Sequence, residues 1–251
     1  MGSMTPGKLI VFEGGEGSGK TTQIQRLHDW LSQGETLQAL QRHHGVAGIK
    51  LTREPGGTAL GQHIRHLLLS PSDTPILSNT ELLLYAADRT QHVEETLRPW
   101  LTQGYWVLCD RYTDSTVAYQ GYGRQLDLKL IDQLNQIATG GLKTDLTLWL
   151  KLSPAVGLAR MRQRAQADRI EQASLRFHQR VADGFAALAQ PMADGRANPM
   201  SSGPIAAVEG DRSIEAIAAH IQQILQQKLA QWYPLLSQKP AQSHSQTPSQ
   251  Q

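Results

Sequence analysis

Cysteine is almost absent from this sequence, since Cys109 is the only one among 251 residues. A single cysteine excludes an internal disulfide framework and any zinc site built from several cysteines. Cys109 ends a short apolar run, and cysteine is among the residue types most often buried. We therefore expect Cys109 to be a small buried residue of a strand.

Long apolar stretches and a strong charge imbalance are also lacking. No apolar run is long enough to cross a bilayer, and the N-terminus lacks the basic region and apolar core of a signal peptide. We therefore expect a cytoplasmic protein with no membrane partner. The formal net charge of +2 is too small to argue for nucleic acid as a partner. With 39% hydrophobic residues, the chain can bury one good core in one domain or two small ones.

Apolar runs of strand length alternate with segments of helical period along the chain. This alternation is typical of an α/β protein in which helices cover both faces of a parallel sheet. The last helix is expected behind Ser213, and Gly140 is a stop signal for an earlier one. Residues 194–204 and 34–45 are expected to be loops. The five predicted strands are residues 8–13, 48–52, 106–110, 146–151 and 205–209.

A glycine-rich segment between the first predicted strand and a predicted helix matches the full phosphate-binding loop pattern. Its glycines let backbone N–H groups surround a polyphosphate, and the following helix adds the positive end of its dipole. Lys20 is expected at the β and γ phosphates, and the Thr21 hydroxyl at Mg²⁺. The motif predicts a P-loop NTPase fold with a five-stranded parallel sheet. The predicted loop residues are Gly14, Gly15, Glu16, Gly17, Ser18, Gly19, Lys20, Thr21 and Thr22.

Arginines follow three of the predicted strands, at the sheet edge where open α/β proteins bind ligands. Arg65 and Arg111 can each hold a phosphate through two parallel hydrogen bonds, a geometry that lysine cannot offer. Asp110 ends a strand and is expected to hold Mg²⁺ or a water bound to it. A third cluster is expected to be either a solvated charged face or a lid that closes over the transferring phosphate. Its arginines are Arg160, Arg162, Arg164 and Arg169.

Five ordered motifs make the sequence resemble thymidylate kinases of the bacterial type over about 200 residues. They are FEGGEGSGKTT at residues 12–22, TREPGGT at 52–58, YAADR at 85–89, DRYTDSTVAYQG at 110–121 and DRIE at 168–171. The resemblance implies transfer of the γ-phosphoryl group of ATP to dTMP with Mg²⁺. The family divides by whether its catalytic arginine lies in the P-loop or in the lid. Because the P-loop carries Glu16 and the expected lid carries the arginines, the sequence resembles the lid-arginine type.

The resemblance also implies roles for individual residues. Arg65 and Arg111 would bind the dTMP phosphate, Tyr85 would stack on thymine, and Arg89 would bond a thymine carbonyl. Tyr119 would stand under the sugar. The substrate-binding residues so predicted are Arg53, Glu54, Pro55, Arg65, Tyr85, Arg89, Arg111, Thr116, Tyr119 and Gln120, and the catalytic ones are Lys20, Asp110, Arg111, Arg160, Arg164 and Arg169.

The resemblance divides the chain into an N-terminal extension, residues 1–7, and a nucleoside monophosphate kinase-like domain, residues 8–233. Residues 155–172 form its expected lid, and residues 234–251 an expected disordered tail. The family implies a homodimer, with residues 79–100 and 112–121 as candidates for the contact face. The alternatives are another P-loop nucleotide or small-metabolite kinase, a GTP-hydrolysing switch, and an inactive nucleotide-binding scaffold. The switch would need an Asn-Lys-x-Asp motif, which the sequence lacks.

Overall fold

A five-stranded parallel sheet forms the centre of the computed structural model, which describes residues 6–72, 74–162, 168–193 and 195–234. The strand order is β2-β3-β1-β4-β5, and every neighbouring pair is parallel. The predicted strands are confirmed, and their ends differ from the prediction by one residue at most. They are β1 (Leu9–Glu13), β2 (Gly48–Arg53), β3 (Tyr105–Asp110), β4 (Leu146–Lys151) and β5 (Ile205–Glu209).

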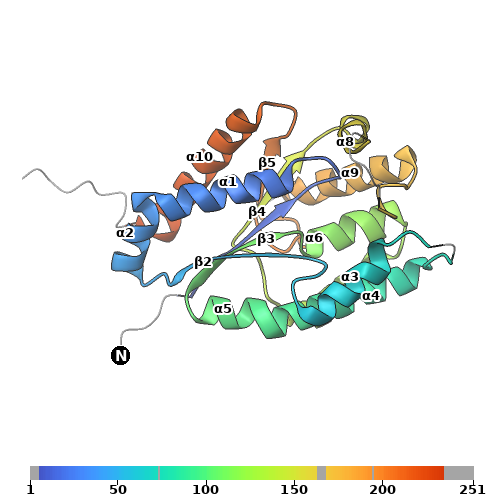
Figure 1. Cartoon of the computed structure of the whole chain (residues 1–251), viewed down its shortest axis with the longest axis horizontal. Coiled ribbons are helices and arrows are strands. Elements are labelled where there is room, and N and C mark those ends of the chain that lie inside the picture. Colours follow the sequence, from blue (N-terminus) through green and yellow to red (C-terminus); the bar gives the residue numbers. More distant parts are fainter. Residues whose placement is uncertain (1–5, 73, 163–167, 194, 235–251) are drawn as a thin grey trace, which may run out of the picture.

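Helices cover both faces of the sheet, as predicted (Figure 1). On one face lie α1 (Lys20–Gln33), α2 (Glu35–His44) and α10 (Ile214–Trp232). The remaining helical segments are α3 (Ala59–Leu69), α4 (Ser78–His92), η1 (Val93–Leu97), α5 (Arg98–Thr102), α6 (Thr113–Thr116), η2 (Val117–Gly123), α7 (Leu128–Thr139), α8 (Pro154–Met161) and α9 (Leu175–Ala189).

The central strand β1 is buried along its whole length, because alternate side chains face the helices on either side. Ile10 and Phe12 pack with α1 and α10. Leu9 and Val11 pack with η1 and β3 on the opposite face. The carboxyl end of β1 is therefore held rigidly where the P-loop begins.

Two helix boundaries predicted from the sequence are confirmed. Ser213 caps α10, its side chain accepting a hydrogen bond from the backbone N–H of Ala216. Gly140 ends α7 in a left-handed conformation, with φ 53°. Cys109 is fully buried in β3, as expected.

Residues 34–45 were expected to be a loop, and this prediction is wrong. They contain the helix α2, which ends at Gly45 in a left-handed conformation with φ 66°. Leu40 is the only residue of α2 that is fully buried. So sparse an apolar pattern gives little helical signal, and packing against the core decides the conformation instead.

The assignment of residues 112–121 to a dimer face is also wrong. All of them are buried within the monomer, where Ala118 and Tyr119 pack against α9. Helix α4 does keep an exposed apolar residue, Leu83, at 56% exposure. No helix in the described ranges is both long and apolar enough to cross a membrane. The expected disordered tail lies outside the described residues except for Pro234.

Candidate active site

A cavity of about 240 Å³ opens at the carboxyl ends of β2 and β3, beside the P-loop. Of the predicted site residues that the structure describes, Gly14, Gly15, Arg160 and Arg169 are not in its lining, and Arg164 falls outside the described residues. Four residues of the expected lid, Met161, Asp168, Ile170 and Glu171, also line the cavity. The predicted residues in the lining are Glu16, Gly17, Ser18, Gly19, Lys20, Thr21, Thr22, Arg53, Glu54, Pro55, Arg65, Tyr85, Arg89, Asp110, Arg111, Thr116, Tyr119 and Gln120.

The P-loop needs glycine at defined positions for conformation and for space. Gly14, Gly17 and Gly19 have φ values of 143°, 68° and 89°, which residues with a Cβ rarely adopt. A Cβ on Gly17 would also lie 2.3 Å from the carbonyl oxygen of Gly157 in α8. The loop therefore packs directly against α8.

Lys20 begins α1 and lies against the P-loop backbone. Its Nζ donates to the carbonyl oxygens of Gly14 at 2.9 Å and Gly15 at 3.0 Å, and the residue is only 8% exposed. Burial and the nearby Arg111 charge lower the pKa of Lys20. Gly19, the N-cap of α1, has no side chain that could cap the helix. Gly19, Lys20 and Thr21 line the cavity, so the positive terminus of α1 lies beside it.

Arg111 follows β3 in a left-handed conformation, with φ 73°. Glu13, at the end of β1, holds this turn by accepting from the backbone N–H groups of Tyr112 at 2.8 Å and Ser115 at 3.1 Å. Burial and the neighbouring Asp114 raise the pKa of Glu13 to about 7. Sequence reasoning missed the role of Glu13, because its partners are 99 and 102 residues away.

The guanidinium of Arg111 lies between the P-loop and η2. Its Nη2 donates to Glu16 Oε1 at 2.7 Å, and the hydroxyl of Tyr119 donates to the same oxygen at 2.7 Å. Burial alone would raise the pKa of Glu16, but the charges of Arg111 and Lys20 lower this pKa to about 2. An ionised carboxylate thus orients Arg111 at the junction of the P-loop and the rest of the cavity.

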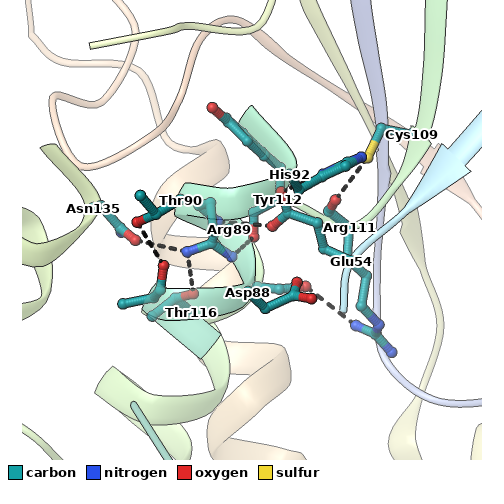
Figure 2. A network of polar contacts seen from close by, with 12 residues as sticks. Glu54, Asp88, Arg89, Thr90, His92, Cys109, Arg111, Tyr112, Thr116 and Asn135 are labelled. Carbon is teal, nitrogen blue, oxygen red and sulfur yellow. Dashed lines mark hydrogen bonds and ion pairs between the residues drawn. The ribbon is translucent and has the colours of Figure 1, made fainter. Parts of the chain in front are cut away.

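Arg89 is only 2% exposed and lies in a network of hydrogen bonds (Figure 2). Its Nε donates to Glu54 Oε2 at 2.8 Å, and its Nη2 donates to the backbone carbonyl of Tyr112 at 3.0 Å. Its Nη1 donates to Thr116 Oγ1 at 2.8 Å and Asn135 Oδ1 at 2.9 Å. Burial acts to lower the pKa of Arg89, but the Glu54 carboxylate more than compensates and raises it.

The other oxygen of Glu54 lies 2.9 Å from Nδ1 of His92, whose Nε2 lies 2.6 Å from Thr52 Oγ1. Both oxygens of Glu54 are therefore paired within the protein. Sequence reasoning missed His92 and Asn135, since neither belongs to a motif that marks phosphate binding. Arg65 donates to the carbonyl oxygen of Pro55 at 3.0 Å, and the Glu54–Pro55 peptide bond is cis.

Two arginines of the expected lid, both predicted to be catalytic, have different surroundings in the structure. Arg160 lies near the P-loop, with Nη1 3.5 Å from the Gly17 carbonyl oxygen, and it pairs with Asp211 at 3.4 Å. Arg169 instead donates to the Leu68 carbonyl at 2.7 Å and pairs with Glu81 at 2.6 Å. Arg169 thus ties the segment after α8 to α3 and α4.

Glu81 is a further residue that sequence reasoning missed. It is fully buried and accepts from Gln120 Nε2 at 2.8 Å and from Arg124 at 3.0 Å, as well as from Arg169. Burial would raise the pKa of Glu81, but these hydrogen bonds and charges lower it. Gln120 therefore lines the cavity in an orientation that Glu81 fixes.

Thr21 and Asp110 both line the cavity, as the prediction of a Mg²⁺ site requires. Hydroxyl and carboxylate oxygens are suitable ligands for this hard cation. In the described ranges, no group of three or more His, Cys, Asp or Glu side chains could hold a metal ion alone. The residues fit an ion whose remaining ligands are phosphate oxygens and water.

Comparison with known proteins identifies the family. The thymidylate kinase family model matches residues 12–198. A thymidylate kinase of Cyanothece sp. is 54% identical over 92% of this chain and 98% of its own length. One of Thermosynechococcus vestitus is 50% identical over 93% of this chain and 92% of its own. A crystal structure of thymidylate kinase from Ehrlichia chaffeensis is 32% identical, with a TM-score of 0.63, and the match covers 88% of this chain and 100% of that one. The chain therefore belongs to the thymidylate kinase family.

Proposed function

We propose a division of the cavity between donor and acceptor that accounts for the reaction of the family. As a thymidylate kinase, the chain phosphorylates dTMP to dTDP, and the family uses ATP. The P-loop would hold the ATP phosphates, with Lys20 at the β and γ phosphates. The single observation that carries this arrangement is that Lys20 and Arg111 line one cavity together with Glu16, which pairs with Arg111.

The acceptor phosphate would lie between Arg111 and Arg65. Both line the cavity, and each guanidinium offers the two parallel N–H groups that a phosphate accepts. A phosphate monoester has a second pKa of about 6 and is mostly ionised at neutral pH. No strong general base is therefore needed, and the protein supplies position and positive charge.

The thymine base would lie against Tyr85, with its carbonyl near Arg89. Tyr85 lines the cavity and is partly buried, and Thr116 and Gln120 line the cavity as well. Tyr119 would stand under the sugar, since Glu16 fixes its hydroxyl. Arg53 and Pro55 would complete this wall, while Glu54 would act through Arg89 and His92.

Thr21 and Asp110 would hold Mg²⁺. When bound, this ion would neutralise the charge that develops on the phosphate oxygens. Thr21 belongs to the donor side and Asp110 to the carboxyl end of β3, beside Arg111. These two residues would thus orient the donor relative to the acceptor.

Among the lid arginines, Arg160 is the best supported candidate for stabilising the transition state. It extends toward the P-loop carbonyl of Gly17, whereas Arg169 is held by the buried carboxylate of Glu81. Arg169 would position the lid, and Arg160 would supply charge to the phosphoryl group, as in the lid-arginine type. Arg164 remains a candidate by its sequence alone.

A homodimer is supported by an apolar surface on α3 and α4. Leu67 and Leu83 are 59% and 56% exposed, and Leu60 on α3 is exposed as well. α3 and α4 pack against each other, so these leucines belong to neighbouring helices. A second copy of the chain would cover this α3–α4 surface.

The role of Arg111 is tested by comparing Arg111→Ala with Arg176→Ala, which removes an exposed arginine of α9. Loss of two charge-assisted hydrogen bonds to the acceptor should lower kcat/KM for dTMP by at least about 100-fold. Arg176→Ala should retain activity. Near-normal turnover by Arg111→Ala, measured as ADP release, would refute the proposed acceptor site.

A further inference from the structure

The buried guanidinium of Arg89 has almost no hydrogen-bonding capacity left. An arginine side chain has five N–H donors, and the protein occupies four of those of Arg89. Nε has one partner, Nη1 has two, and Nη2 has the carbonyl of Tyr112. Among the residues that the structure describes, one Nη2 N–H of Arg89 therefore stays available to a ligand.

The four partners also fix the direction of the remaining donor. They come from separate parts of the fold: Glu54 from the loop after β2, Tyr112 from the turn after β3, Thr116 from α6 and Asn135 from α7. Because guanidinium is planar, contacts on three sides of it allow little rotation. Arg89 lines the cavity, and the second N–H of Nη2 is the donor that these four contacts leave for a base.

Asn135 has a distinct part in this arrangement. It is itself buried, and its Oδ1 accepts the second N–H of Nη1 at 2.9 Å, as Figure 2 shows. Without that acceptor, Nη1 would have an unpaired buried donor, which is unfavourable. The guanidinium could then turn to offer the cavity a second donor.

We propose that Asn135 is a positioning residue for base selectivity: by occupying Nη1, it leaves Arg89 a single donor that only a carbonyl at the facing base position can accept. The inference rests on the proposed contact between Arg89 and the thymine carbonyl. Thymine and uracil present an acceptor at that position. Cytosine presents an amino group, which would meet the Arg89 N–H as donor against donor and leave both unpaired.

The test measures kcat and KM for dTMP and dCMP in the full-length enzyme. Asn135→Ala should raise KM for dTMP about tenfold with kcat within about twofold, because ground-state and transition-state binding are lost together. The ratio of kcat/KM for dTMP over dCMP should fall about tenfold. Asn135→Asp keeps an acceptor and should restore the ratio. Gln136→Ala, which truncates an exposed amide on the same helix, should leave both constants unchanged.

Asn135→Gln provides a second variant if the alanine variant does not fold. It keeps the amide but displaces the acceptor by one methylene, so selectivity should fall while the thermal unfolding midpoint stays close to that of the parent. Equal losses for dTMP and dCMP, in either variant, would overturn the proposal. Failure of Asn135→Asp to restore selectivity would do so too.

Arg89→Lys separates this proposal from the one on which it rests. If Arg89→Lys lowers the dTMP to dCMP ratio and Asn135→Ala does not, only the role of Asn135 is refuted. If Arg89→Lys leaves the ratio unchanged, the proposed base contact of Arg89 is refuted, and the role of Asn135 with it.

Discussion

At the residue scale, Asp88 is a buried carboxyl whose titration is linked to folding. Its Oδ1 accepts from the backbone N–H of Gly56 at 3.0 Å, yet burial and the nearby Glu54 charge raise its pKa to about 6. Between the unfolded pKa of 3.8 and about 6, the folded state binds more protons than the unfolded state. The protonated Asp88 carboxyl therefore stabilises the folded state fully below pH 4, and this stabilisation is lost as the pH rises through 6.

Asp88→Asn should remove this dependence. Relative to the parent protein, its free energy of unfolding should increase between pH 4 and pH 7, by up to about 3 kcal/mol from the size of the shift. Urea denaturation at both pH values would measure this change. Asp132→Asn, at a partly exposed position of α7, serves as the control. The linkage is refuted if the two variants show the same difference between the two pH values.

At the scale of elements, the packing of the P-loop against α8 makes glycine more strictly required at position 17 than at position 15. In Gly17→Ala the new Cβ would meet the Gly157 carbonyl, and φ is positive; at Gly15 a Cβ would have nothing within 4 Å. Gly17→Ala should therefore lower kcat/KM for ATP at least tenfold more than Gly15→Ala does. Steady-state kinetics with varied ATP would measure both. Equal losses would show that the contact with α8 does not determine the loop's conformation.

Elements with a local signal were predictable, and those that depend on distant contacts were not. The apolar strands and the glycine-rich loop carry their signals within about ten residues, so β1 and the P-loop were located correctly. α2 was missed, because its stability comes from packing. Glu13, His92 and Asn135 were missed as site residues for the same reason. Their partners lie in other segments, and a lone polar residue in a helix or strand does not show what it will meet.

At the scale of the whole molecule, the α3–α4 surface predicts a dimer. Sedimentation velocity should give a mass about twice the chain's 27.7 kDa. Leu83→Glu places a charge on that surface and should yield monomers, because an unpaired charge in an apolar interface is unfavourable. Leu130→Glu, at an exposed position of α7, should leave the dimer intact. A parent protein that sediments as a monomer at micromolar concentration would contradict the proposal.

The central claim is that one cavity joins the P-loop to a site selective for thymidylate. The most direct test is ADP release with ATP and Mg²⁺, comparing dTMP, dUMP, dCMP and dGMP. We predict the highest kcat/KM for dTMP, a loss of about 10 to 200-fold for dUMP, which lacks one methyl group, and about 10⁴-fold lower values for dCMP and dGMP. Turnover of dCMP comparable to that of dTMP would contradict the proposed base site. ATP binding without phosphorylation of any monophosphate would instead indicate an inactive nucleotide-binding scaffold.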